Sequence, residues 1–169
     1  IEHLDLIKKK EIEFINPNNF EEALKKQKND KKILLTIDDG FKSFYENAWP
    51  TLKKRKIPFV LFVNTREVGS YGYMNWTQIN EIAKEKFVHI GNHSFSHEYL
   101  IDKKNEEIIY DINQAISDFK NNIGYNSPFF SYPFGEYSND FKKIIKELGF
   151  KYAFGQHSGV ADESKNFYE

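Results

Sequence analysis

The sequence predicts an α/β fold, either an open parallel sheet or most of a barrel. Short apolar runs alternate with segments of helical periodicity, which is the pattern of β-α-β units around a parallel sheet. Clusters of polar residues follow three of the apolar runs, and in both architectures the functional residues gather at the carboxyl ends of the strands. At 169 residues the chain has the usual size of one domain, and we expect residues 1–169 to form a single domain.

Two strands are expected in the N-terminal half. Residues 33–37 are a short apolar run that stops at Asp38, as a buried strand would. Pro58 opens the second run, at residues 59–63. Helices are predicted before, between and after these strands, at residues 1–10, 41–56 and 75–86. Thr77 is a candidate N-cap for the third helix.

Three more strands are expected in the C-terminal half, at residues 87–90, 128–131 and 150–154. Gly91 ends the first of them. A long helix at residues 106–122 has one apolar face, formed by Ile109, Ile112, Ile116 and Phe119. A shorter helix at residues 140–148 is closed by Gly149.

The overall composition excludes several classes of function. The net charge is −1, so no overall field attracts nucleic acid or a membrane surface. The chain has no cysteine, which excludes disulfides, thiolate metal sites and a cysteine nucleophile. No apolar run approaches the length of a membrane span. The first residue, Ile1, lies in a helical pattern unlike a signal peptide, so we expect that the chain has been trimmed at its N-terminus.

The pair Asp38-Asp39 is the first candidate for chemistry. Two adjacent carboxylates at the end of a buried strand repel each other unless a positive charge lies between or beside them. The alternative is a simple turn, because Asp-Gly is common turn chemistry and Gly40 follows. Taken alone the pair favours the turn; the histidines described next favour a metal site.

His93 and His97 are spaced by four residues, directly beyond the third expected strand. In a helical turn such positions share a face, so both rings reach one ion. Two histidines and a carboxylate form a common ligand set for Zn²⁺ or a similar divalent ion, with positions left open for water and substrate. The alternative, two unrelated structural histidines, is disfavoured because both follow one strand end, opposite the carboxylate pair.

An ion at this place divides the work between the two carboxylates. One of them ligates the ion, which lowers the pKa of water bound to it. The other stays free to accept the proton, and the neighbouring cation keeps it ionised. Adjacent residues at a strand end point in different directions, so one faces the metal and the other the substrate.

Residues 131–137 form a third cluster, in which proline and glycine make a tight turn between aromatic residues. These rings are candidates for an apolar wall or a face for a sugar ring, whereas Phe134 is expected to be ordinary core. Among the other histidines, His89 is predicted to be a satisfied structural residue within a strand. His157 follows the fifth strand and is a minor candidate for the site, and His3 receives no role.

The three clusters, in this order, resemble the polysaccharide deacetylase family, also called the NodB-homology or family 4 carbohydrate esterases. Residues 36–40, Thr-Ile-Asp-Asp-Gly, match its first motif, T-[FI]-D-D-G. Residues 93–97, His-Ser-Phe-Ser-His, match its second, H-[ST]-x-x-H. Residues 130–135, Phe-Ser-Tyr-Pro-Phe-Gly, look like the third. The resemblance runs from about residue 33 to residue 159, and the first two motifs together are highly specific.

The resemblance implies a distorted (β/α)7 barrel and a role for each residue. Asp38 would be the catalytic base, while Asp39, His93 and His97 would bind one divalent ion, zinc in the first place, with cobalt or nickel as alternatives. The backbone N–H of Tyr132 would help to hold the oxyanion as water attacks an N-acetyl group. The implied partner is an N-acetylated polysaccharide outside the cytoplasm, in the periplasm or at the cell surface.

The departures from the family pattern are also informative. Many members have an arginine in the third motif that steadies the base, and Ser131 occupies the matching place. The form of residues 131–137 looks closer to the branch that acts on poly-β-1,6-N-acetylglucosamine, the biofilm polysaccharide. The family's acid histidine is not clearly present, and the chain is short of two barrel strands. We therefore expect an incomplete barrel, with the general acid outside residues 1–169.

Three functions stay open at this point. The first is removal of acetyl groups from N-acetylglucosamine units of a polysaccharide. The second keeps the barrel and changes the substrate to peptidoglycan, chitin oligosaccharides or a cyclic amide. The third is a non-catalytic metal-binding or glycan-binding relative, which the missing acid favours and the intact Asp38 disfavours.

Overall fold

A curved parallel sheet forms the centre of the molecule. The computed structural model describes residues 2–25, 31–156 and 167–168. Within them the sheet has five strands in the order of the sequence, all paired in parallel. The strands are β3 (Thr36–Ile37), β4 (Phe59–Val63), β5 (Val88–Asn92), β6 (Phe129–Ser131) and β7 (Tyr152–Phe154). A parallel sheet whose strands follow chain order curls like the wall of a barrel, and the predicted incomplete barrel is confirmed.

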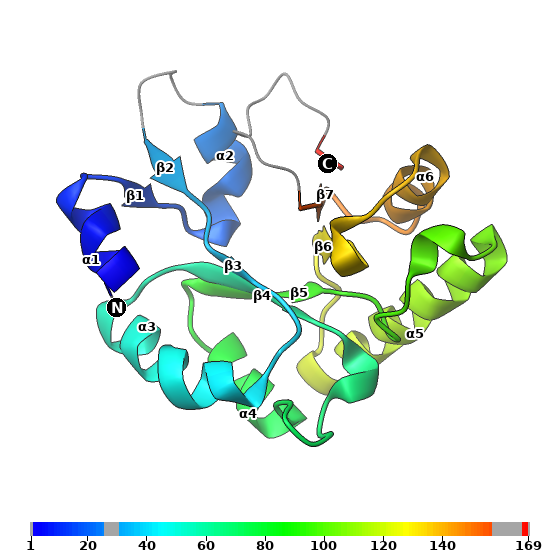
Figure 1. Ribbon diagram of the computed structural model, residues 1–169, viewed down its shortest axis with the longest axis horizontal. Coiled ribbons are helices and arrows are strands. Elements are labelled where there is room, and N and C mark those ends of the chain that lie inside the picture. The colour runs from blue at the N-terminus through cyan, green and yellow to red at the C-terminus, as the bar shows by residue number, and fades with distance from the viewer. Residues whose placement is uncertain (1, 26–30, 157–166, 169) are drawn as a thin grey trace.

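Helices cover the outside of this wall. Figure 1 shows α3, α4, α5 and α6 arranged around the convex side of the sheet. They span Trp49–Arg55, Trp76–Ala83, Asn105–Ile123 and Asn139–Glu147, and a π-helical segment at Phe44–Ala48 leads into α3. In the described part of the chain, no helix has both the length and the apolar composition needed to cross a membrane.

The N-terminal segment adds a small two-stranded sheet and two helices beside the main sheet. It contains α1 (Glu2–Lys9), β1 (Glu13–Phe14), α2 (Phe20–Leu24) and β2 (Lys32–Ile33). β1 and β2 pair in parallel as a two-stranded sheet. Helix α1 agrees with the amphipathic pattern of the first ten residues, although none of its side chains is buried.

Side chains on the two faces of the sheet pack into different clusters. The outer face, with Phe59, Leu61 and Ile90, packs against α3, α4 and α5. The inner face, with Val60, Phe62, Phe129 and Tyr152, packs around Phe20 of α2. This filling of the interior from β4, β6, β7 and α2 leaves the carboxyl ends of the strands as the place for polar residues.

Three details differ from the sequence-based expectation. The apolar run 33–37 is two strands, because the chain changes partner within it: the Ile15 N–H donates to the Ile33 oxygen, and the Val60 N–H donates to the Leu35 oxygen. Helix α4 is capped by Asn75 rather than Thr77, because Asn75 and Gln78 exchange side chain-to-backbone hydrogen bonds of 2.9 and 3.0 Å.

The third difference concerns the inward face of α5. Ile109 is 36% exposed, whereas Ile108 and Asp111 are 3% and 7% exposed. The buried stripe is therefore Ile108, Asp111, Ile112, Ala115 and Phe119. The prediction was wrong at Ile109 because a carboxylate, Asp111, occupies a position that apolar periodicity assigns to a hydrophobic residue.

Candidate metal centre

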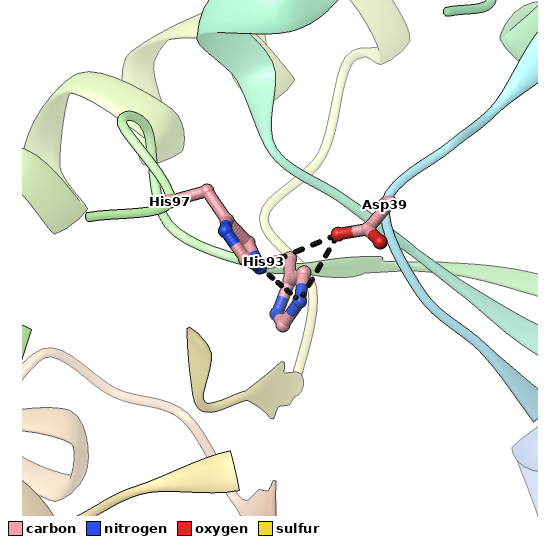
Figure 2. A group of neighbouring side chains, drawn as sticks. All are labelled: Asp39, His93 and His97. Carbon is pink, nitrogen blue, oxygen red and sulfur yellow. Dashed lines mark hydrogen bonds and ion pairs between the residues drawn. The ribbon is translucent and has the colours of Figure 1, made fainter. Parts of the chain in front are cut away.

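Asp39, His93 and His97 converge at the carboxyl end of the sheet. Asp39 follows β3 and adopts a left-handed backbone with φ +72°, and Gly40 follows with φ +74°. His93 comes directly after β5, where its N–H continues the ladder by donating to the Val63 oxygen. Figure 2 shows the carboxylate of Asp39 and the two imidazole rings pointing toward one another.

The donor atoms of these three residues form a compact triangle. Asp39 Oδ1 lies 3.6 Å from His93 Nε2 and 3.3 Å from His97 Nε2. The two Nε2 atoms are 3.2 Å apart. An ion bound at about 2.0–2.1 Å in tetrahedral geometry holds its nitrogen and oxygen donors about 3.3 Å from one another. The spacing and the chemistry of this donor set therefore fit a zinc-like divalent ion.

The tautomer of His93 also suits a ligand. Its Nδ1 lies 2.7 Å from the Ser131 main-chain oxygen, which can only accept, so Nδ1 carries the proton. That leaves the lone pair on Nε2, which points to the centre of the triangle. Burial lowers the pKa of His93, which favours the neutral ring that a metal ligand needs.

The two histidines lie in a loop and not in a helical turn as expected. Ser94 and His97 have positive φ angles of +67° and +52°, which no α-helix contains. The spacing of four residues pointed to the right pair of ligands, but a folded loop brings the rings together. Both rings reach the site because the chain bends between them, at Phe95 and Ser96.

Asp38 lies beside the three donor residues and does not belong to their triangle. It keeps access to solvent, yet the surrounding protein desolvates the carboxylate, and this burial raises its pKa. The nearby His93 and a hydrogen bond from the Ser131 side chain act in the opposite direction. Ser131, at the position of the missing arginine, thus contacts both Asp38 and His93.

Tyr132 does not have the expected role. Its N–H donates to the Phe154 oxygen at 3.0 Å, and the residue is 1% exposed. Its ring packs against Phe130 and Phe141 in the core between the sheet and α6. Because this N–H is already bonded within the sheet, the prediction that it holds the oxyanion is wrong.

Phe134, expected to be core, is instead a surface residue next to the site. It is 54% exposed, and its ring centre lies 4.8 Å from that of His97 and 5.8 Å from that of Tyr99. Phe41, 41% exposed, packs on Tyr73 at 5.0 Å and lies two residues beyond Asp39. Exposed aromatic rings therefore follow two of the strand ends that form the site.

Among the described residues, His3 and His89 are not part of this centre. His89 lies within β5 against the rings of Tyr125 and Phe129, at 5.2 and 5.1 Å. Its Nε2 is buried and has no hydrogen-bond partner in the described part of the chain, so it is structural but not satisfied as predicted. His157 lies outside the described residues.

Two residues that matter to the site were given no such role from the sequence. Ser131 supplies the oxygen that fixes the His93 tautomer, and Asp111 of α5 accepts hydrogen bonds from the loop between the histidines. For Asp111 the sequence did contain a signal, namely a carboxylate within the apolar stripe of a long helix. For Ser131 the sequence shows only that it stands where many related sequences have arginine.

Comparisons with known proteins give one consistent result. Residues 25–153 match the family model described as polysaccharide deacetylase. A poly-beta-1,6-N-acetyl-D-glucosamine N-deacetylase of Staphylococcus aureus is 28% identical over 177 residues, which cover 96% of this chain and 61% of that protein. This chain therefore spans less than two thirds of the length of that relative.

Two solved structures share the fold. The structure of IcaB from Ammonifex degensii has a TM-score of 0.84 and 28% identity, covering 91% of this chain and 73% of that one. The Streptococcus pyogenes deacetylase PplD, solved in complex with acetate, has a TM-score of 0.88 and 22% identity. That match covers 98% of this chain and 74% of PplD.

Proposed function

Because the chain belongs to the polysaccharide deacetylase family, we propose that it hydrolyses N-acetyl groups on N-acetylglucosamine units of a polysaccharide. The observation that carries the proposal is the triangle of Asp39, His93 and His97 with the free carboxylate of Asp38 beside it. A metal-ligand set next to an unligated carboxylate is an arrangement suited to hydrolysis.

We assign the three triangle residues as ligands of one divalent ion, with zinc as the first candidate and cobalt or nickel as alternatives. When bound, such an ion acts as a Lewis acid that polarises a carbonyl and makes water a better nucleophile at neutral pH. The Ser131 main-chain oxygen holds the His93 ring in the orientation that a ligand needs.

Asp38 is the proposed general base. Its carboxylate is open to solvent and adjacent to the donor triangle, so it can accept a proton from a water molecule there. Burial shifts the pKa of this carboxylate toward neutral pH, and a general base is most effective when its pKa is near the pH at which it works. The Ser131 hydroxyl, which bonds this carboxylate, orients it. The departing amine also requires a proton. That its donor is a general acid outside residues 1–169 remains a prediction.

The favoured substrate is poly-β-1,6-N-acetylglucosamine. The name of the staphylococcal relative supports this choice, as does the pattern of residues 131–137. Phe134 and Tyr99, both exposed beside His97, offer apolar faces on which a sugar ring can stack. Such a polymer lies outside the cell, so we also propose an extracytoplasmic location.

An acetate-release assay on a panel of N-acetylated glycans tests the proposal. We expect release from poly-β-1,6-N-acetylglucosamine, loss of release with a chelator, and recovery on adding zinc or cobalt. Release from chitin oligosaccharides or peptidoglycan alone would move the substrate and keep the chemistry. Glycan binding without acetate release, in protein loaded with metal, would instead favour a non-catalytic binding module.

A further inference from the structure

The loop that carries His93 and His97 has an unusual pattern of hydrogen bonds. Five consecutive main-chain N–H groups, those of residues 94–98, each donate to a side-chain oxygen at 2.8–3.2 Å. The acceptors, in order, are Asn92 Oδ1, Asp111 Oδ1, Asp111 Oδ2, Ser94 Oγ and Ser96 Oγ. Side chains therefore replace the backbone partners that a helix or strand would give this segment.

Asp111 is the acceptor that comes from outside the loop. It lies on α5, is 7% exposed, and uses one oxygen for the Phe95 N–H at 2.9 Å and the other for the Ser96 N–H at 3.0 Å. Both bonds go to residues that lie between the two histidines in the sequence. A buried carboxylate with both oxygens bonded to main-chain N–H groups is a strong and directional anchor.

The loop needs such an anchor because its backbone is strained. Ser94 and His97 both lie in the left-handed region, which is unfavourable for residues with a side chain. Such conformations persist only where the surroundings hold them. One strained residue, Ser94, directly follows the ligand His93, and the other, His97, is itself a ligand.

A second contact ties the same loop to the same helix. Asp118 lies seven residues after Asp111 on α5, and it accepts a hydrogen bond of 2.7 Å from the Thr65 hydroxyl. The Thr65 N–H in turn donates to the Ser94 oxygen at 3.2 Å. Helix α5 thus holds the loop through two carboxylates on one side of the helix, directly through Asp111 and indirectly through Asp118.

We propose that Asp111 is a positioning residue for the metal ligands. By fixing residues 94–97, it sets the two Nε2 atoms 3.2 Å apart before any ion binds. The inference rests on the proposed metal site and adds a residue that touches neither the ion nor the substrate. A ligand pair arranged in advance binds its ion more tightly because less ordering is needed at the moment of binding.

Cobalt binding to the metal-free protein tests this inference without any activity measurement. The variant Asp111→Asn keeps one acceptor oxygen and turns an amide NH₂ toward the other N–H donor. We expect its Kd for Co²⁺ to rise about 10- to 100-fold, the range seen when residues supporting a metal ligand are removed. The visible spectrum of bound cobalt should change as well, because it reports the arrangement of the ligands. Glu106→Gln, on the exposed side of the same helix, is the charge-matched control and should leave both unchanged.

Two further measurements separate positioning from a general loss of stability. In metal-free Asp111→Asn, hydrogen exchange should accelerate at the amides of Phe95 and Ser96, while the amides of β5 keep their protection. Asp111→Glu keeps both oxygens and the charge, and should recover part of the cobalt affinity. If Asp111→Asn fails to fold, Asp111→Glu takes its place in the test. The Kd of Asp111→Glu for Co²⁺ should then be at least that of the unmodified chain and at most tenfold higher.

The outcomes that overturn the inference differ from those that overturn the metal site. If the unmodified chain binds no cobalt, zinc or nickel, the metal site is wrong and the role of Asp111 falls with it. If the unmodified chain binds cobalt and folded Asp111→Asn binds it within threefold of the same Kd, the metal site stands and Asp111 has no positioning role. If Asp111→Asn does not fold and Asp111→Glu binds cobalt more than tenfold more weakly than the unmodified chain, the inference also fails.

Discussion

Gly91 provides a sharp test of how the sheet supports the site. It lies opposite Phe62 in the pairing of β4 with β5, two residues before His93. A Cβ atom at this position would overlap Cδ1 and Cε1 of the Phe62 ring and lie 3.0 Å from Val60 Cγ1. The Phe62 ring cannot move away into solvent because it is fully buried, 5.5 Å from the ring of Phe154.

We predict that Gly91→Ala destabilises the protein, against the usual trend. In a strand with ordinary φ, glycine to alanine stabilises by about 0.4–1 kcal/mol through the unfolded state. Forcing a methyl group into a filled core costs about 1–3 kcal/mol. The net loss should be about 1–2 kcal/mol, which lowers the Tm of a chain of this size by about 2–8 °C.

Urea unfolding of the metal-free protein measures this effect without a contribution from ion binding. The matched comparison is a double-mutant cycle with Phe62→Leu, which removes the ring edge that the new methyl group meets. The two changes should then couple favourably by about 1 kcal/mol or more, because each relieves the defect that the other creates. A Gly91→Ala protein at least as stable as the original, or effects that add within about 0.5 kcal/mol, would refute the reasoning.

Three further predictions concern the histidines and Asp38. The double variant of His93→Ala with His97→Ala should lose its ion while circular dichroism shows the fold retained; stoichiometric metal in that variant contradicts the ligand assignment. Asp38→Asn should keep its metal and release acetate about 10²–10⁴-fold more slowly, as for a lost general base, and near-normal turnover would show that the roles are wrongly divided. Burial lowers the pKa of His89 to about 4, below the value of about 6.5 in the unfolded chain, so the unfolded state binds more protons between these values. Stability should therefore fall as the pH drops from 6.5 toward 4, by about 1 kcal/mol at pH 5 after allowance for partial exposure, and His89→Phe should lose this dependence if His89 is its source.

The fold class could be predicted because the strands are short, buried and clearly separated. β4 is an uninterrupted apolar run, and all five of its residues are buried. β2 and β3 were read as one strand because periodicity reports burial and not the identity of the hydrogen-bonding partner. That partner changes at Leu34 and Leu35, which the sequence alone does not record.

The metal ligands could be predicted from residue type and spacing, but the geometry that unites them could not. A spacing of four suggests a helical turn, whereas the loop depends on hydrogen bonds to Asn92, two residues before Ser94, and to Asp111 in another element. Tyr132 was misassigned because its N–H is consumed by β7, a pairing distant in sequence. Contacts of this kind follow from tertiary structure.

The position of β3 gives the site a further property. This strand has two residues, lies at the edge of the described sheet and pairs with β4 alone within it. Its end carries Asp39, while the histidines follow β5, two strands away. An ion held by all three residues would therefore fasten the edge strand to the interior of the wall, and fraying of β3 would have to break a coordination bond as well as two strand pairings. Removing the ion should therefore first increase the rate at which β3 opens from the sheet, under conditions where the other strands stay folded.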